Sequence, residues 1–169
     1  MSATTSGSDP HQLAPDHLPT PFTADEIREG CQPGRTVRSL VEEQGREPYV
    51  RVTRFVSATD EAAEQETWHE RPDGTRLTDP ERGRSTWLAF QGHASFPAAN
   101  TAVTEEEMDI PAGHFATLRY IQREGDVVRE FWFARSAPGM PLRFEEWDGP
   151  NLVYRSTALE NVPAERPSE

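Results

Sequence analysis

The chain has 169 residues and a mass of 19.0 kDa, enough for one domain with a hydrophobic core. Its formal charge of -12 argues against nucleic acid or an anionic membrane as a partner, because both are bound through a basic face. All 17 cationic residues are arginine, which excludes chemistry that needs a lysine, such as Schiff-base formation.

Apolar residues are scarce, but aromatic residues are not. Leu, Ile, Val and Phe account for 30 of the 169 residues, a share typical of disordered chains. Four Trp and eight Phe argue for a folded, aromatic-rich domain instead. We expect a single domain over residues 22–161. The segments 1–21 and 162–169 are rich in polar residues and Pro, and we predict them to be disordered tails.

The sequence carries few signs of a compartment. The first twenty residues have no apolar core behind a positive start, and no stretch approaches 18 apolar residues. The single Cys31 permits no internal disulfide. We therefore expect a cytoplasmic protein without membrane insertion.

The first predicted element is a short helix. Thr23 is placed to cap it, and Glu26 at the third helical position completes a capping box. Phe22 and Ile27 flank the cap at the spacing of a hydrophobic staple. The helix is expected to end near Gly30.

Strands are predicted to follow. β-branched and aromatic residues dominate 49–56, and a polar strand over 64–71 contains Trp68 and leads into an Asp-Gly turn. A second short helix is expected over 86–92, with Ser85 as its cap. Later turns recur every 11 to 14 residues, which leaves room for one strand between each pair and indicates an antiparallel meander.

These elements predict a fold class. We expect a β-rich α+β domain whose single, strongly curved, mostly antiparallel sheet forms a half-barrel of about eight strands, with one or two short helices. Residues 127–134 place large apolar groups on both faces, which is typical of a central strand covered on both sides. Cross-strand pairs between arginines and Glu130 or Glu145 are expected on the polar face.

Three segments resemble a known type of domain. The run Ile110–Tyr120 (IPAGHFATLRY), the run Phe131–Ala134 (FWFA) and the run Pro138–Leu142 (PGMPL) resemble bacterial half-barrel β domains of the lipoprotein-carrier (LolA/LppX-like) type. The resemblance covers residues 100–160. It implies a curved antiparallel sheet with helices in its concave face, and a hydrophobic cavity that holds acyl chains in the carriers.

The aromatic residues and arginines point to binding as the first functional hypothesis. A curved sheet with alternating large and small residues leaves a hollow, and an arginine there offers a fork for a carboxylate or phosphate. We expect non-enzymatic binding of an apolar or amphipathic small molecule, with no cofactor. The expected ligand-binding residues are Trp68, Tyr120, Trp132 and Arg119.

Two alternatives remain open. The first is a small-metabolite enzyme that uses His69 or His93 as its acid or base, because histidine titrates near neutral pH. The second is a homo-oligomeric interaction or structural protein that pairs through an edge strand.

A metal site is the weakest hypothesis. Imidazole and carboxylate groups suit zinc or iron, and His69, His93 and His114 have Glu70 and Glu105 to Glu107 among their possible partners. No recognised metal-ligand spacing links them, so we predict no metal.

Overall fold

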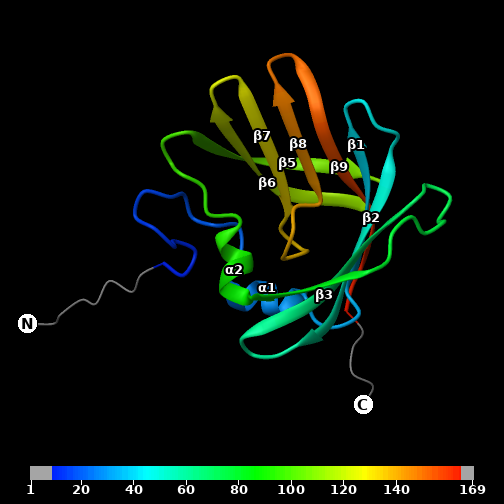
Figure 1. The fold of residues 1–169 in the computed structure, drawn as a ribbon. Coiled ribbons are helices and arrows are strands. Elements are labelled where there is room, and N and C mark those ends of the chain that lie inside the picture. Colours follow the sequence, from blue (N-terminus) through cyan, green and yellow to red (C-terminus); the bar gives the residue numbers. More distant parts are fainter. Residues whose placement is uncertain (1–8, 165–169) are drawn as a thin grey trace, which may run out of the picture.

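The computed structural model describes residues 9–164, which form two short helices and one nine-stranded sheet (Figure 1). The helices are α1 (Ala24–Gly30) and α2 (Trp87–Gly92). The strands are β1 (Thr36–Glu43), β2 (Tyr49–Ala58), β3 (Ala62–Glu70), β4 (Glu81–Thr86), β5 (Thr101–Ile110), β6 (Gly113–Glu124), β7 (Val127–Ala134), β8 (Arg143–Asp148) and β9 (Asn151–Val162).

The sheet consists of two antiparallel meanders that share one seam. Its strand order is β4-β3-β2-β1-β9-β8-β7-β6-β5, so the N-terminal and C-terminal meanders meet where β1 pairs with β9. The sheet curves around the helices and leaves β4 and β5 as its edges (Figure 1). This confirms the expected β-rich α+β half-barrel, including the meander over the C-terminal half, with nine strands in place of about eight.

One core lies between the helices and the face of the sheet that curves around them, which we call the concave face. This concave cluster is mostly aromatic and includes Phe22, Phe55, Trp87, Tyr120 and Phe133. Aromatic rings bury large areas and also gain from edge contacts, so a chain poor in Leu and Ile still builds a core here.

A second core lies on the opposite face, which we call the back face. Trp132 and Ala134 alternate with Phe131 and Phe133 along β7, so they point away from the helices. Met108 and Leu142 pack with Trp132 in this back cluster. The hairpin between β5 and β6 reaches the back of β9, where the amide of Ala112 donates to the carbonyl oxygen of Ala158 at 3.2 Å. The expected coverage of β7 on both faces is therefore confirmed.

Local sequence chemistry explains both helix starts. The Thr23 hydroxyl accepts from the Glu26 amide at 3.1 Å, and a Glu26 carboxylate oxygen accepts from the Thr23 amide at 3.0 Å, which confirms the capping box. The cap of α2 is Thr86, whose hydroxyl accepts from the Ala89 amide at 3.0 Å. The prediction of Ser85 was wrong by one residue, because either hydroxyl fits the local pattern.

The segment 9–21, which we expected within a disordered tail, lies against α2 and the loop after it. The Leu18 amide donates to the Phe96 carbonyl oxygen at 2.8 Å, and Thr20 is buried. This segment finds hydrogen-bond partners far along the chain, which composition does not reveal. Residues 1–8 and 165–169 of the expected tails lie outside the described residues. Neither helix in residues 9–164 is long and apolar enough to cross a membrane.

Candidate ligand-binding site

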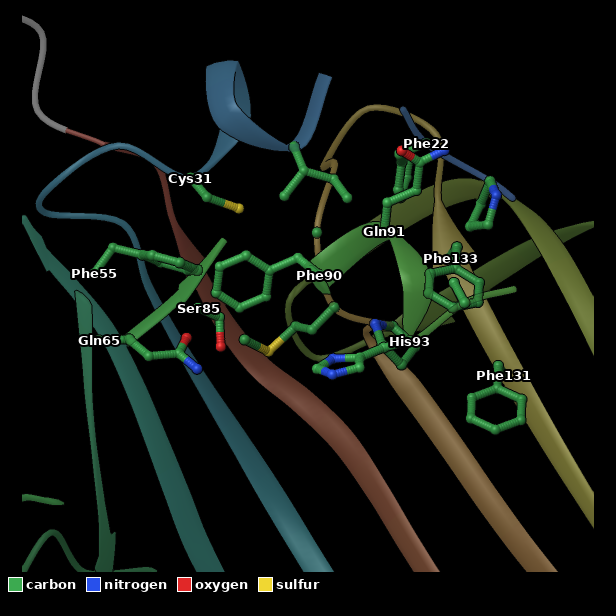
Figure 2. A pocket seen from close by; sticks show the side chains of 16 residues that line it. Phe22, Cys31, Phe55, Gln65, Ser85, Phe90, Gln91, His93, Phe131 and Phe133 are labelled. Carbon is green, nitrogen blue, oxygen red and sulfur yellow. The ribbon is translucent and has the colours of Figure 1, made fainter. Parts of the chain in front are cut away.

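A cavity of about 280 Å³ lies between the two helices and the concave face of the sheet. Phe55 on β2 and Phe90 on α2 line one side, and Phe131 and Phe133 on β7 lie opposite (Figure 2). The connection between β7 and β8, residues 135–142, enters the concave side of the sheet and adds Gly139, Met140 and Pro141 to the wall (Figure 1). We call this connection the β7–β8 strap.

The aromatic walls hold one another in place. The Phe22 ring meets Phe133 edge-on with 6.2 Å between ring centroids, and Phe55 meets Phe90 in the same way at 6.0 Å. Edge-to-face pairs of this kind contribute about 0.5–1.5 kcal/mol beyond their buried area. The cavity is therefore an apolar space with preformed walls, as small-molecule sites usually are.

Gln91 forms part of the cavity wall, but its polar atoms are already engaged. Its Oε1 accepts from the Ala24 amide at 2.9 Å. Its Nε2 donates to the Pro10 carbonyl oxygen at 2.8 Å and to the Thr20 hydroxyl at 3.0 Å. The side chain ties α2 to α1 and to the N-terminal segment, so its role in the cavity is structural.

Cys31 and Arg35 form a buried pair behind the strap. Arg35 Nη1 donates to Cys31 Sγ at 2.9 Å and to the Pro138 carbonyl oxygen, and Arg35 Nε donates to Asn161 Oδ1 at 3.3 Å. Burial raises the pKa of the Cys31 thiol, and the opposing effect of Arg35 does not cancel it. Cys31 is therefore protonated near neutral pH. It lines the cavity as a small, mainly hydrophobic side chain with a weak S–H donor.

Comparisons with known proteins give a fold but no family. No family model matches the chain. A search of curated proteins finds no match. The fold is similar to that of MucB. In the complex structure of Pseudomonas aeruginosa MucA/MucB, a chain aligns with a TM-score of 0.56 and 14% identity, over 86% of this chain and 56% of that chain.

Two further MucB structures agree. A crystal structure of MucB aligns with a TM-score of 0.55 and 12% identity, over 85% of this chain and 58% of that one. MucB in complex with MucA(peri) aligns with a TM-score of 0.56 and 13% identity, over 86% of this chain and 54% of that chain. The chain thus spans a little over half the length of the MucB chains. The likeness supports a curved-sheet fold, while the finer assignment to the lipoprotein-carrier type stays a prediction.

The MucB comparison corrects one expectation. We expected a cytoplasmic protein, but the structural neighbours, MucB and the MucA/MucB complex, are periplasmic. The expectation rested on the composition of the first twenty residues, and that composition is not evidence about location.

The four residues expected to bind a ligand do not converge in the MucB-like fold. Tyr120 lies in the concave cluster, where its hydroxyl donates to the Pro19 carbonyl oxygen at 2.8 Å, outside the cavity wall. Arg119 and Trp132 meet on the back face, with the guanidinium 5.0 Å from a ring centroid. Trp68 lies on β3, where its Nε1 donates to Glu70 at 2.8 Å. That these residues bind a ligand stays a prediction.

Strand alternation explains the separation. Arg119 and Tyr120 are consecutive residues of β6, so their side chains point to opposite faces. The same rule separates Trp132 from the cavity residues Phe131 and Phe133. Alternation along β7 was the signal that could have found the cavity side. No sequence signal marks the contributions of Gln91 or the strap.

The histidines lie in three separate places. His69 stacks on Tyr49 with 4.5 Å between ring centroids, and burial together with Arg46 and Arg51 lowers the pKa of His69. His93 is exposed at the rim of the cavity. His114 contacts Glu107 at 2.8 Å and Asp109 at 2.5 Å on the surface, where Asp109 raises the pKa of His114. Residues 9–164 contain no cluster of three or more His, Cys, Asp or Glu suited to a metal ion.

Proposed function

We propose that this domain is a binding module that holds an apolar or amphipathic small molecule in the cavity between α1, α2 and the concave face. The main support for this proposal is the cavity itself, which has phenylalanine rings on two opposite sides and a volume of about 280 Å³. That volume lies just below the range typical of small-molecule sites, about 300–1,000 Å³.

Two polar residues buried in the cavity wall favour holding a ligand over transforming it. The Cys31 thiol is protonated and engaged with Arg35, and the Gln91 amide is engaged with backbone and Thr20. Neither side chain is poised as a nucleophile or a general base.

A partner polypeptide is a second candidate occupant. The neighbours with this fold include MucB in complex with MucA, so a MucB-like fold takes part in protein recognition elsewhere. On this alternative an apolar side chain of the partner would enter the same cavity. The alternative and the first proposal share the site and differ in what fills it.

A cavity-filling variant tests the proposal. Ala94 is buried and lines the cavity, whereas Ala99 is exposed and does not. We expect a neutral, environment-sensitive naphthylamine dye to bind the wild type and the Ala99→Leu control. Binding to Ala94→Leu should fall by at least tenfold because leucine occupies the space. Thermal unfolding of each variant checks that the fold is intact.

The size of the stabilisation offers a second readout. A ligand at one hundred times its Kd stabilises the folded state by about 2.7 kcal/mol, so the dye should raise the Tm of the wild type and of Ala99→Leu only. Equal dye affinity in all three proteins, or no binding to any of them, would contradict the proposal.

A further inference from the structure

An open groove continues the cavity along the concave face. It has a volume of about 370 Å³, and Phe131, Met140 and Pro141 line both spaces. Beyond these shared residues the groove is lined by Arg51 on β2, by Phe144 and Glu146 on β8, and by Tyr154 and Ser156 on β9. A ligand longer than the cavity would pass the strap residues Met140 and Pro141 and continue in this groove.

Arg51 is the cation of the groove, and it lacks a counterion. It takes part in none of the ion pairs formed by residues 9–164. The carboxylate of Glu146, which also lines the groove, accepts from Arg129 Nε at 2.7 Å. Arg51 Nη1 donates to the Tyr154 hydroxyl at 2.8 Å, which orients the guanidinium but leaves its charge uncompensated.

The two residues directly opposite Arg51 in the sheet carry no negative charge, and Glu43 on β1 already accepts from Arg46 and from the Tyr49 hydroxyl. Its register partners are Ser39 on β1 and His69 on β3. Burial, Arg46 and Arg51 together lower the pKa of His69, so this ring is neutral near pH 7. Burial followed by the hydrogen bond to Glu43 raises the pKa of Tyr49, which stacks on His69, to about 12, and this phenol is therefore neutral as well.

A guanidinium in this setting suits an anion at the end of an apolar chain. Arginine presents a planar fork of donors that matches carboxylate and phosphate groups. The net charge of -12 repels anions at long range, but exposed charges are screened over about 8 Å at physiological ionic strength. The local cation therefore decides binding within the groove.

We propose that the ligand is an amphiphile whose anionic head binds Arg51 and whose apolar chain runs past Met140 into the cavity. This inference rests on the proposed function, because the cavity must accept the chain. It adds the chemical class of the head and the direction in which the ligand lies.

Matched probes separate the head from the chain. Dodecanol, dodecanoate and dodecyl phosphate share one chain, and each competes with the neutral dye. Wild-type protein should bind at least one of the two anions about ten- to a hundredfold more tightly than the alcohol, which is the range of a charge-assisted hydrogen bond. The comparison of the two anions shows whether a carboxylate or a phosphate is preferred.

Two variants on the same strand complete the test. Arg51→Gln should remove the preference for the anion and leave the affinity for dodecanol unchanged. Arg54→Gln is the control, because Arg54 is an exposed residue of β2 and lies three residues from Arg51, so it faces the other side of the sheet. It should leave all three affinities unchanged.

The outcomes distinguish the inference from the proposed function. Equal binding of alcohol and anions by the wild type overturns the anionic head and leaves the proposed function standing. An equal loss of alcohol and anion binding in Arg51→Gln overturns it too, since that pattern indicates a structural role through Tyr154. Failure of all three probes to displace the dye counts against both proposals.

Discussion

Glu145 is a buried carboxylate on the back face, where two arginines bind it. Its Oε2 accepts from Arg143 Nη2 and from Arg155 Nε, each at 2.9 Å, and the residue is 5% exposed. Burial alone would raise the pKa of this carboxyl, but the hydrogen bonds and charges of the two arginines outweigh burial and lower it. Arg119 binds Glu130 at 2.8 Å nearby, so the expected cross-strand pairing of arginines with these two glutamates is confirmed.

This arrangement predicts a pH-dependent stability. Because the pKa of Glu145 is lower in the folded protein than in the unfolded chain, its contribution is present above the unfolded value, about 4.3, and is lost as pH falls through the folded value. Glu145→Gln should lower the free energy of unfolding by about 1–3 kcal/mol at pH 7. The gap should narrow as pH falls below about 4.3 and should close once pH is below the folded value.

Urea denaturation at pH 7 and at pH 3.5 measures both values. Glu160→Gln is the matched control, because Glu160 is 55% exposed and pairs with Arg38 at 3.5 Å. Its effect should be about 0–1 kcal/mol at pH 7. A Glu145→Gln gap that is as large at pH 3.5 as at pH 7 would show that the carboxylate charge is not the cause.

At the scale of elements, the β7–β8 strap is the part that shapes the cavity. Arg35 holds the strap through the Pro138 carbonyl oxygen, and Gly139 follows with a φ of +133°. A Cβ at Gly139 would lie 2.6 Å from Arg35 Nη1 and 2.9 Å from Cys31 Sγ. Glycine is therefore required twice, for its backbone conformation and for the close approach of the buried pair.

A substitution in the strap should be costly. Gly139→Ala combines a strained φ with overpacking, and we expect it to lower the free energy of unfolding by about 2–4 kcal/mol. Gly125→Ala is the control, because Gly125 also has a positive φ, +59°, but a Cβ there would meet no neighbouring atom within 4 Å. That variant should lose only about 1–2 kcal/mol. Equal losses by chemical denaturation would refute the close contact with Arg35 and Cys31.

The elements were predictable where local chemistry defines them. The capping box at Thr23 and Glu26, and the meander with its regular turns, depend on neighbours in sequence. The strap was not predictable in the same way. Met140, Leu142 and Phe144 alternate with other positions as in a strand, yet β8 begins only at Arg143. Pro141 has no amide hydrogen to donate to a neighbouring strand, and the Pro138 carbonyl oxygen accepts from Arg35 instead of from the sheet.

At the scale of the whole molecule, the curved sheet carries a different cluster on each face. The concave cluster includes Phe133, and the back cluster includes Trp132. The sequence showed that both faces of β7 are apolar, but it could not show which face the helices would cover. The expected set of Trp68, Tyr120, Trp132 and Arg119 mixed the two faces for this reason, and Phe131 and Phe133 line the cavity instead.

Two methionines report directly on whether a ligand occupies the cavity on the concave face. Met140 lines the cavity and the groove, although it also packs against the back cluster, whereas Met108 is a buried member of that cluster and lines neither space. Protein labelled with 13C at the methionine methyl groups is titrated with dodecanol and observed by NMR. We expect a saturable shift of the Met140 methyl resonance and an unchanged Met108 resonance. A saturable shift of Met108 with Met140 unchanged, or no shift of either, would contradict this expectation.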